Sequence, residues 1–434
     1  MAQILTIFVG QCGNQVGSHL LRQICDEHSH TLHNISIEKI GIDRHPEDME
    51  IFFRVYGDKI IPRILSLDMD PSTTGYLIDD IRKILEPYEN LGLDTVNVLQ
   101  GTGGCAKNWG VGNTMAEQHE EDIKTRLFEL GASTASGIHF IHSAGGGTGS
   151  GFTSYIVRKL KTWFKEWNVT IPPRIIPFLI ISSSQDPVTT SPYNTILTLN
   201  TLREHADALV LFDNNALMGG MARLTQIPNF DYSEINPVIA KICSSISAPS
   251  RFPRRQGQNI DFVDIVSNLN IHKDAKMSVP SYFPLTKEEE ESVISKQVNL
   301  NEMINIALDE NHTFLTCPLE NDKTIAMNIM GRGPWGMDEI GQAANLAGIE
   351  VNTPNIHHNV AGMPPNRAFG NVLILSTTKA ETEPFTDIYE RAMWLFDREY
   401  YLEYYEEQGY SKQFLKTELN SFNEMIESLR GLKT

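Results

Sequence analysis

Five glycines fall within the seven residues GGGTGSG, from Gly145 to Gly151, between an apolar segment and an amphipathic one. The preceding GIHFIHSA has the continuous apolar character of a buried strand, and the following GFTSYIVRKLKTWFKEW has helical spacing. Glycine is the residue that allows tight turns and close backbone approach to a ligand. The segment therefore restricts the chain to folds in which a strand, a glycine loop and a helix follow one another.

The same order of strand, loop and helix recurs along the first half of the chain. Buried strands are predicted in AQILTIFV, IPRILSLDMD, RIIPFLIIS and ALVLFDN, with helices after the first three. This alternation predicts an α/β fold, with a parallel sheet covered by helices on both faces and ligands at the carboxyl ends of its strands. A long helix is predicted over 232–247, bent or weakened at Pro237.

The second half has a different texture. Two predicted strands, TIAMNIMGRG and NVLILSTTKA, surround a predicted helix, MDEIGQAANLAG. The acidic LTKEEEESVISKQ (285–297) is predicted to be a charged loop, and the chain from about Thr386 to be helical. A second, smaller α/β unit followed by helices is therefore expected.

The glycine loop fits several chemistries. A Walker phosphate loop needs GxxxxGK[ST], and its lysine is missing. A dinucleotide fingerprint, GxGxxG, fits nominally, but that motif usually opens a domain and has an acidic residue about 20 positions on, whereas the helix after this loop is rich in Lys and Arg. In a third arrangement, backbone N–H groups and a helix N-terminus wrap the phosphates, with Thr148 adding a hydroxyl. A purely structural turn is the remaining alternative.

Further loops are predicted at the same edge of the sheet. The first strand ends in GQCGNQ, the second ends in LDMDP with Asp68 and Asp70 two residues apart, and the segment GTGGCAKNWGVG is again rich in glycine. Two carboxylates beside a phosphate suit a hydrated Mg²⁺, although alone they are typical of a solvated turn or a helix cap. Several such loops together predict a nucleotide triphosphate site.

Charge and cysteine content exclude some classes of function. The chain has 36 basic and 54 acidic residues, a net charge of −18, which argues against nucleic-acid and anionic-membrane binding. No apolar segment approaches the roughly 20 residues of a membrane span, and no signal peptide is expected. The cysteines are scattered, so a disulfide framework is not expected and a cytoplasmic location is predicted. They are Cys12, Cys25, Cys105, Cys243 and Cys317.

Six segments, in order along the chain, resemble the tubulin family, within the tubulin/FtsZ superfamily: GQCGNQ, NWGVG, GGGTGSG, SPYNTILTLNTL, DNNAL and SRFP. The resemblance covers nearly all 434 residues, including REYYLEYYEEQGYSKQF near the end. It implies a Rossmann-like parallel-sheet GTPase domain, a long central helix, a second α/β domain and C-terminal helices. The expected boundaries are 1–230, 231–250, 251–382 with the catalytic loop, and 383–434.

The resemblance also implies which residues bind GTP or GDP with Mg²⁺. The residues implied to lie along the phosphates and base are Gln11, Cys12 and Gln15, and those near the metal and γ-phosphate are Asp68 and Asp70. The residues implied to surround the phosphates are Ser143, Gly146, Gly147, Thr148 and Gly149. Those implied to contact guanine are Asn214, Tyr232 and Asn236. Tyr232 is expected to stack on the base. From the residues alone, Tyr232 and Asn236 fit a helix N-terminus facing solvent as well.

The chain departs from the family pattern at several positions. Ser191 stands where the family usually has a ribose-binding glutamate, and Asp186 lies slightly upstream as a substitute. Lys107 stands where asparagine is common. The chain ends in ESLRGLKT with no long acidic tail, so partners that bind such tails are not expected.

The segment NIDFVD carries Asn259, Asp261 and Asp264 in the spacing NxDxxD, which resembles the catalytic loop of FtsZ. In the family this loop enters the nucleotide site of the next subunit. A carboxylate can orient water in line with a γ-phosphate, so Asp264 is predicted to be catalytic in trans. The alternative is that these acids cap a helix, and both roles can coexist.

A chain with both a nucleotide site and a carboxylate for its neighbour is predicted to be a cytoskeletal GTPase that self-assembles head-to-tail into filaments or microtubule-like tubules, with lateral protofilament contacts. The FtsZ-like loop and the absent tail favour a prokaryotic source, archaeal or bacterial. One alternative is a GTP-binding accessory subunit that enters or nucleates another tubulin polymer. A dinucleotide-dependent oxidoreductase is a third possibility, without an evident catalytic pair.

Overall fold

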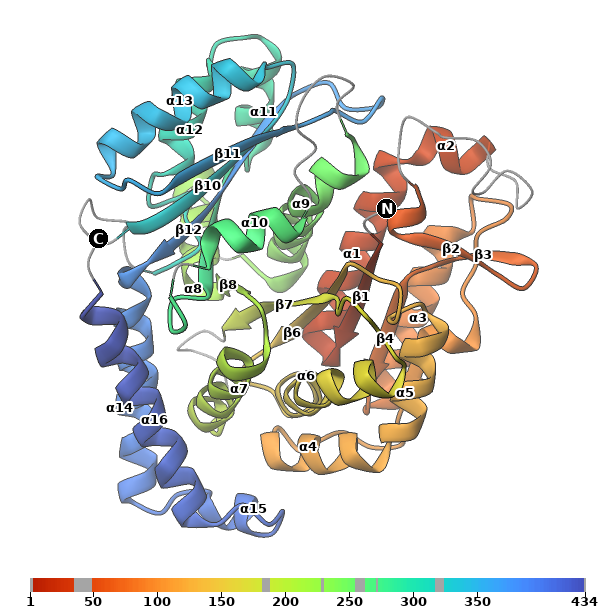
Figure 1. The fold of residues 1–434 in the computed structure, drawn as a ribbon, viewed down its shortest axis with the longest axis vertical. Helices are drawn as coiled ribbons and strands as arrows, with labels where there is room; N and C mark the ends of the chain where they lie inside the picture. Colours follow the sequence, from red (N-terminus) through yellow and green to blue (C-terminus); the bar gives the residue numbers. More distant parts are fainter. Residues whose placement is uncertain are drawn as a thin grey trace.

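The computed structural model describes residues 3–34, 49–181, 188–227, 230–253, 262–270, 272–316 and 324–432. Ten strands of this part form one sheet in the order β11-β10-β12-β9-β8-β7-β6-β1-β4-β5 (Figure 1). They are β1 (Ile4–Val9), β4 (Ile64–Asp68), β5 (Val98–Gln100), β6 (Gly137–Ser143), β7 (Arg174–Ile181), β8 (Leu209–Asp213), β9 (Met277–Phe283), β10 (Thr324–Arg332), β11 (Ile356–Ala361) and β12 (Asn371–Thr378). A separate hairpin pairs β2 (Phe53–Tyr56) with β3 (Lys59–Pro62).

The helices fall between the strands and at the end of the chain. They are α1 (Gly10–Glu27), α2 (Ser29–Asn34), α3 (Pro71–Leu85), α4 (Trp109–Gln118), α5 (Glu120–Glu129), α6 (Thr148–Glu166), α7 (Ser191–His205), α8 (Asn214–Thr225), α9 (Tyr232–Arg251), α10 (Phe262–Leu269), α11 (Lys287–Ile294), α12 (Leu300–Ala307), α13 (Met337–Glu350), α14 (Thr382–Asp397), α15 (Leu402–Glu406) and α16 (Lys412–Arg430).

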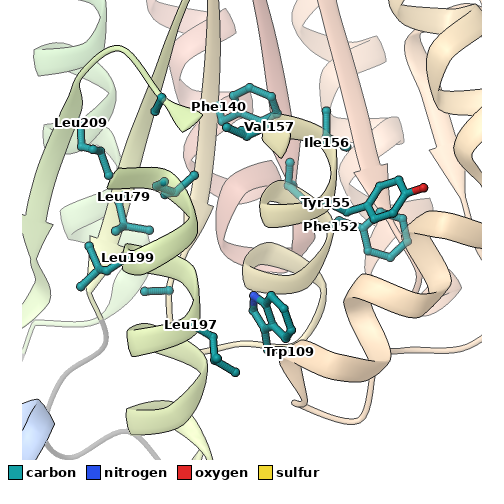
Figure 2. Close-up of a cluster of buried hydrophobic side chains, with 14 of the residues drawn as sticks. Trp109, Phe140, Phe152, Tyr155, Ile156, Val157, Leu179, Leu197, Leu199 and Leu209 are labelled. Carbon is teal, nitrogen blue, oxygen red and sulfur yellow. The ribbon is translucent and has the colours of Figure 1, made fainter. Parts of the chain in front are cut away.

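Six strands of the sheet come first along the chain, β1 and β4 to β8. They pair in parallel, as the alternation of strands and helices predicts. Both faces are covered, which explains why β1 is apolar at nearly every position. Leu5, Ile7 and Val9 face a core shared with α4 to α7, α14 and α16, whereas Ile4 and Phe8 face one shared with α1, α3 and α9. Figure 2 shows part of the first core, where aromatic and aliphatic side chains fill the space beside α6 and α7.

The second half of the sheet is mixed. Strand β9 continues the parallel part through two registered pairs with β8, whereas β12 pairs antiparallel with both β9 and β10. Helices α12 and α13 pack on one face of this half, and α9 and α10 pack on the other. Helix α9 thus lies between the two halves, and α14 and α16 run side by side next to α7 (Figure 1).

Some sequence-based expectations about these elements were wrong. The charged segment 285–297 contains α11 and is not simply a loop, because Thr286 and Glu289 form a capping box at its start. The long helix predicted over about 232–247 is present as α9; it extends to Arg251 and contains Pro237 and Pro249. The C-terminal helical segment is broken after Asp397, where Glu399 and Tyr401 adopt positive φ angles of 57° and 64°.

Within the described ranges, we find no helix whose length and apolar content would let it cross a membrane.

Candidate functional site

A cavity of about 540 Å³ opens at the carboxyl ends of β1, β4, β6 and β8. Apart from the ribose candidate, its lining includes every residue predicted to bind nucleotide or Mg²⁺, from five separate stretches of the chain. These residues are Gln11, Cys12, Gln15, Asp68, Asp70, Ser143, Gly146, Gly147, Thr148, Gly149, Asn214, Tyr232 and Asn236. The structure therefore brings the predicted residues together; their binding roles stay predictions.

Two helices point their N-termini at this cavity without a side-chain cap. Helix α1 begins at Gly10 and α6 begins at Thr148, and neither start has a capping hydrogen bond from a side chain. Three neighbouring helices, α3, α8 and α9, are each capped by an aspartate. The first N–H groups of a helix need an acceptor, and the helix dipole favours an anion there. The two uncapped starts therefore fit a group rich in acceptor oxygens, such as a polyphosphate.

The glycines at these starts allow the loops to pack against each other. Gly10 has φ of +72°, and a Cβ atom there would lie 2.9 Å from the backbone nitrogen of Gly149. A Cβ atom on Gly147 would lie 2.6 Å from the carbonyl oxygen of Cys105. Side chains at either position would push the loops apart, so these glycines are required by close backbone approach.

The two acids at the end of β4 have different surroundings. Oδ1 of Asp68 accepts the backbone N–H of Met69 at 2.8 Å, and Oδ1 of Asp70 caps α3 through the N–H of Ser72 at 3.0 Å. Oδ2 of Asp68 is buried and has no hydrogen-bond partner among the described residues. Burial raises the pKa of Asp68 to about 6, against the lowering effects of the backbone N–H groups and of the nearby Thr148 hydroxyl.

These two carboxylates fit a Mg²⁺ ion that takes its other ligands from phosphate and water. No group of three or more potential metal-ligating side chains occurs in the described ranges, so an all-protein metal cage is not formed there.

The other end of the cavity carries amides. Asn214 at the start of α8 is buried, and its Oδ1 has no partner among the described residues. Asn236, one turn into α9, is only 6% exposed and so does not face solvent, whereas Tyr232 is 45% exposed. Two buried amides, one of them with an unsatisfied oxygen, fit the hydrogen-bonding edge of a base, which the prediction for Asn214 and Asn236 requires.

The glycine-rich loop GTGGCAKNWGVG, expected at this edge of the sheet, contributes Gly104, Cys105, Ala106 and Lys107 to the lining. Sequence reasoning did not assign these four residues to the site individually. It also did not assign Gly10, Ile180 and Val188, which line the cavity too. Ser191 begins α7 and does not line the cavity, and Asp186 lies outside the described residues, so the ribose contact stays a prediction.

Asp264, the one predicted catalytic residue within the described ranges, does not line this cavity. Asp264 is exposed in the first turn of α10, while Asn259 and Asp261 lie outside the described residues. Directly after α10, Nδ2 of Asn270 donates to the carbonyl oxygen of Asp207, which precedes the amino end of β8. The cavity lies at the carboxyl end of the same strand, so α10 is anchored at the opposite edge of the sheet.

A parallel sheet with helix N-termini and acids gathered at its carboxyl edge defines the class of an α/β nucleotide-binding protein. The chain belongs to the tubulin/FtsZ family: residues 3–221 match the model of that family's GTPase domain. It is also similar to a tubulin gamma chain from Candida glabrata, with 26% identity over 451 aligned positions that cover 98% of this chain and 91% of the relative. The predicted family and α/β fold class are confirmed.

Proposed function

We propose that the protein binds and hydrolyses GTP and assembles head-to-tail with copies of itself into cytoskeletal filaments. The observation that carries this proposal is the single cavity that collects two uncapped helix N-termini, the acids Asp68 and Asp70 and the amides Asn214 and Asn236. GTP would place its phosphates at the helix starts and its guanine at the amides. Mg²⁺ held near the acids would neutralise phosphate charge.

Preference for GTP over ATP follows from the amides. Asn214 and Asn236 can pair with the O6, N1–H and N2 edge of guanine, and adenine reverses that pattern. Replacing Asn236 with Ala should weaken GTP binding by about 1–3 kcal/mol, since it leaves a buried partner unpaired. A competition titration of GTP against ATP measures this, and equal affinities in the unaltered protein would contradict guanine recognition.

The position of Asp264 supports hydrolysis in trans. Its helix is anchored at the amino edge of the sheet, whereas the cavity lies at the carboxyl edge. In a head-to-tail contact these edges of successive subunits would face each other, and Asp264 of one subunit would orient water at the GTP of the next. A monomer would hold GTP with an incomplete site.

The test is the GTPase rate per subunit as a function of protein concentration. It should rise where filaments appear, and Asp264→Ala should lower turnover by about 10²–10⁴-fold while leaving GTP binding intact. Asp264→Glu is the matched control, because it keeps a carboxylate and should retain far more turnover. A rate that stays flat across assembly, or full turnover by Asp264→Ala, would place catalysis within one subunit.

A second candidate is a GTP-binding subunit that enters or nucleates another tubulin polymer. It is supported by the match to a tubulin gamma chain over 98% of this chain. The name of that relative marks it as one kind of tubulin among several, and a chain similar to it would act beside other kinds. Sedimentation with GTP separates the candidates. Pelleting of the protein alone supports self-assembly, and pelleting only with added tubulin supports the accessory role.

The location and partners follow from the same proposal. We infer a place in the cytoplasmic cytoskeleton, with copies of the chain as longitudinal partners and lateral contacts between protofilaments. Nucleic acid is not part of the proposal, since the net charge is −18. Membrane insertion is not part of it either, since no helix among the described residues has the length and apolar content to cross a membrane.

A further inference from the structure

Helix α7 carries a fully buried asparagine, Asn194, that contacts both glycine-rich loops of the cavity. Its Nδ2 donates to the carbonyl oxygens of Gly145 at 2.8 Å and Lys107 at 2.9 Å. Its Oδ1 accepts the backbone N–H of Trp109 at 2.9 Å and the phenol hydroxyl of Tyr405 at 2.7 Å. One side chain thus joins the loop before α4, the start of α4, the loop before α6, and α15.

This arrangement uses the whole hydrogen-bonding capacity of an amide, which has two N–H donors and two acceptor positions on its oxygen. The orientation is fixed, because two carbonyls can only accept and the backbone nitrogen of Trp109 can only donate. Aspartate has no N–H groups to offer Gly145 and Lys107. Glutamine carries one more methylene group, and a hydroxyl has a single donor. The site is therefore specific for asparagine.

The two loops that Asn194 joins form the phosphate end of the cavity. Ala106 and Lys107 line it in left-handed conformations with φ of 48° and 54°, which non-glycine residues rarely adopt without external support. Oγ1 of Thr190 gives Lys107 a second hydrogen bond, at 2.6 Å to the same carbonyl oxygen. Gly145 leads directly into the lining residues 146–149. Asn194 thus sets the separation of two loops that would face the phosphates from different sides.

Tyr405 brings the C-terminal part of the chain into this arrangement. Its side chain is fully buried, and α15 makes a second contact through Nδ2 of Asn108, which donates to the carbonyl oxygen of Tyr404 at 3.3 Å. The ring of Tyr405 also packs edge-on against Tyr193, with centroids 5.6 Å apart. The position of the loops therefore depends on α15 as well as on α7.

We propose that Asn194 is a positioning residue that fixes the two phosphate loops, and that Tyr405 makes their position depend on α15. The inference rests on the proposed GTP site. Asn194 bonds to the loops at the phosphate end, and Tyr405 bonds to Asn194. Among the described residues, neither bonds to Asn214 or Asn236, the predicted guanine contacts. Loss of the hydrogen bonds made by the Asn194 amide, or of the one made by the Tyr405 hydroxyl, should therefore change the affinity for the phosphates of a nucleotide and leave the affinity for its base unchanged.

The experiment measures equilibrium binding of GTP, GDP and guanosine to the full-length chain and three variants. Asn194→Asp should weaken binding of GTP and GDP by about 10- to 100-fold, because two buried carbonyls lose their donors, and should leave guanosine binding unchanged. Tyr405→Phe should weaken GTP binding by about 2- to 10-fold through the loss of one hydrogen bond. The matched control is Asn97→Asp.

Asn97 is also a fully buried asparagine whose Nδ2 donates to two carbonyls, those of Pro62 at 3.0 Å and Ile64 at 2.8 Å, at the amino end of β4. Asn97→Asp should lower stability but keep the ratio of GTP to guanosine affinity. A general loss of folding in Asn194→Asp would lower both affinities together.

The outcomes separate this inference from the proposed function. A wild-type chain that binds no GTP contradicts the proposed function itself. If the wild-type chain binds GTP and Asn194→Asp leaves the ratio of GTP affinity to guanosine affinity unchanged, the proposed role of Asn194 is overturned. If Asn194→Asp does not fold, Tyr405→Phe decides, since an unchanged ratio in that variant overturns the inference.

Discussion

Two buried acids, one at the cavity and one at the far end of α1, meet opposite surroundings. Glu27 ends α1 and lies 2.6 Å from Nη1 of Arg251 and 2.8 Å from Nη1 of Arg332, with Arg367 at 3.6 Å. Burial alone would raise the pKa of Glu27, but the charges of Arg332 and Arg251 outweigh it and hold the pKa well below its usual value.

Asp68 has no such partners. Its Oδ1 accepts backbone N–H groups, its Oδ2 is unpaired among the described residues, and burial raises its pKa to about 6. An acid surrounded by guanidinium groups is already satisfied and holds elements together, in this case α1, α9 and β10. A carboxylate in a cavity with one oxygen lacking a hydrogen-bond partner is suited to contact a bound ligand. The surroundings of a buried charge, more than its burial, therefore separate structural from ligand-binding positions.

The largest expected effect is on Glu27. Glu27→Gln should lower the free energy of unfolding by about 3–5 kcal/mol, because it leaves buried guanidinium groups without their carboxylate. Urea unfolding measures this. The control is Glu427→Gln, which removes an exposed pair with Arg430 and should cost less than about 1 kcal/mol. Equal losses of unfolding free energy in the two variants would show that the buried carboxylate of Glu27 contributes no more to stability than an exposed one.

Asp68 should behave in the opposite way. Asp68→Asn removes a half-satisfied buried charge, so the unliganded protein should unfold at the same or a higher urea concentration. Its Mg²⁺-dependent GTP binding should weaken by about 1.5–3 kcal/mol, the usual size of a contact to a charged group. Titrating GTP with Mg²⁺ and with a chelator measures the difference. If chelation weakens binding to the variant as much as to the wild type, Asp68 does not serve the metal.

A third buried acid, Glu381, extends the comparison of Glu27 with Asp68, and its expected effect on stability is smaller. Glu381 is fully buried, its carboxyl oxygens have no partner among the described residues, and burial raises its pKa well above the usual value. Because the folded-state pKa is raised, its contribution to stability is present at low pH and is lost as the pH rises through the unfolded-state pKa and beyond.

Glu381→Gln cannot titrate, so its stability relative to the wild type should increase between pH 5 and pH 6, by at most about 1.4 kcal/mol, the limit set by one proton per pH unit. Unfolding midpoints at the two pH values measure this. A difference that does not change with pH would show that Glu381 ionises normally in the fold.

The parallel half of the fold could be predicted from the sequence, because its strands are buried on both faces and each glycine loop marks a strand end. The same loops led to the cavity residues. The antiparallel pairing of β12 with β9 and β10 could not be predicted, since an apolar strand carries no local signal for the direction of its partner. Strand β11 was not predicted because its sequence, IHHNVA, is partly exposed and lacks a continuous apolar run. Helix α11 was missed because the charged composition of the segment was interpreted as a loop, while the local signal of Thr286 and Glu289 was a capping box.

Within the site, the family resemblance predicted nucleotide contacts that the local sequence pattern could not. Asn236 is an ordinary helical residue in sequence, and only the packing of α9 buries it beside the cavity. Asn194 lies in the recognised segment SPYNTILTLNTL, yet its role depends on Tyr405, more than 200 positions later in the chain. Contacts of this kind arise from tertiary packing and leave no periodic signal.

The uncapped starts of α1 and α6 also have a kinetic consequence. Each helix start carries about half a positive charge that acts only within its first turn, whereas the whole chain carries −18. A polyanion approaching from solution is thus repelled at long range and attracted only at the cavity. Added salt shortens the repulsion, to a screening length of about 8 Å at 0.15 M. Nucleotide capture by this chain should therefore become faster with ionic strength, the reverse of the usual behaviour of electrostatically steered association.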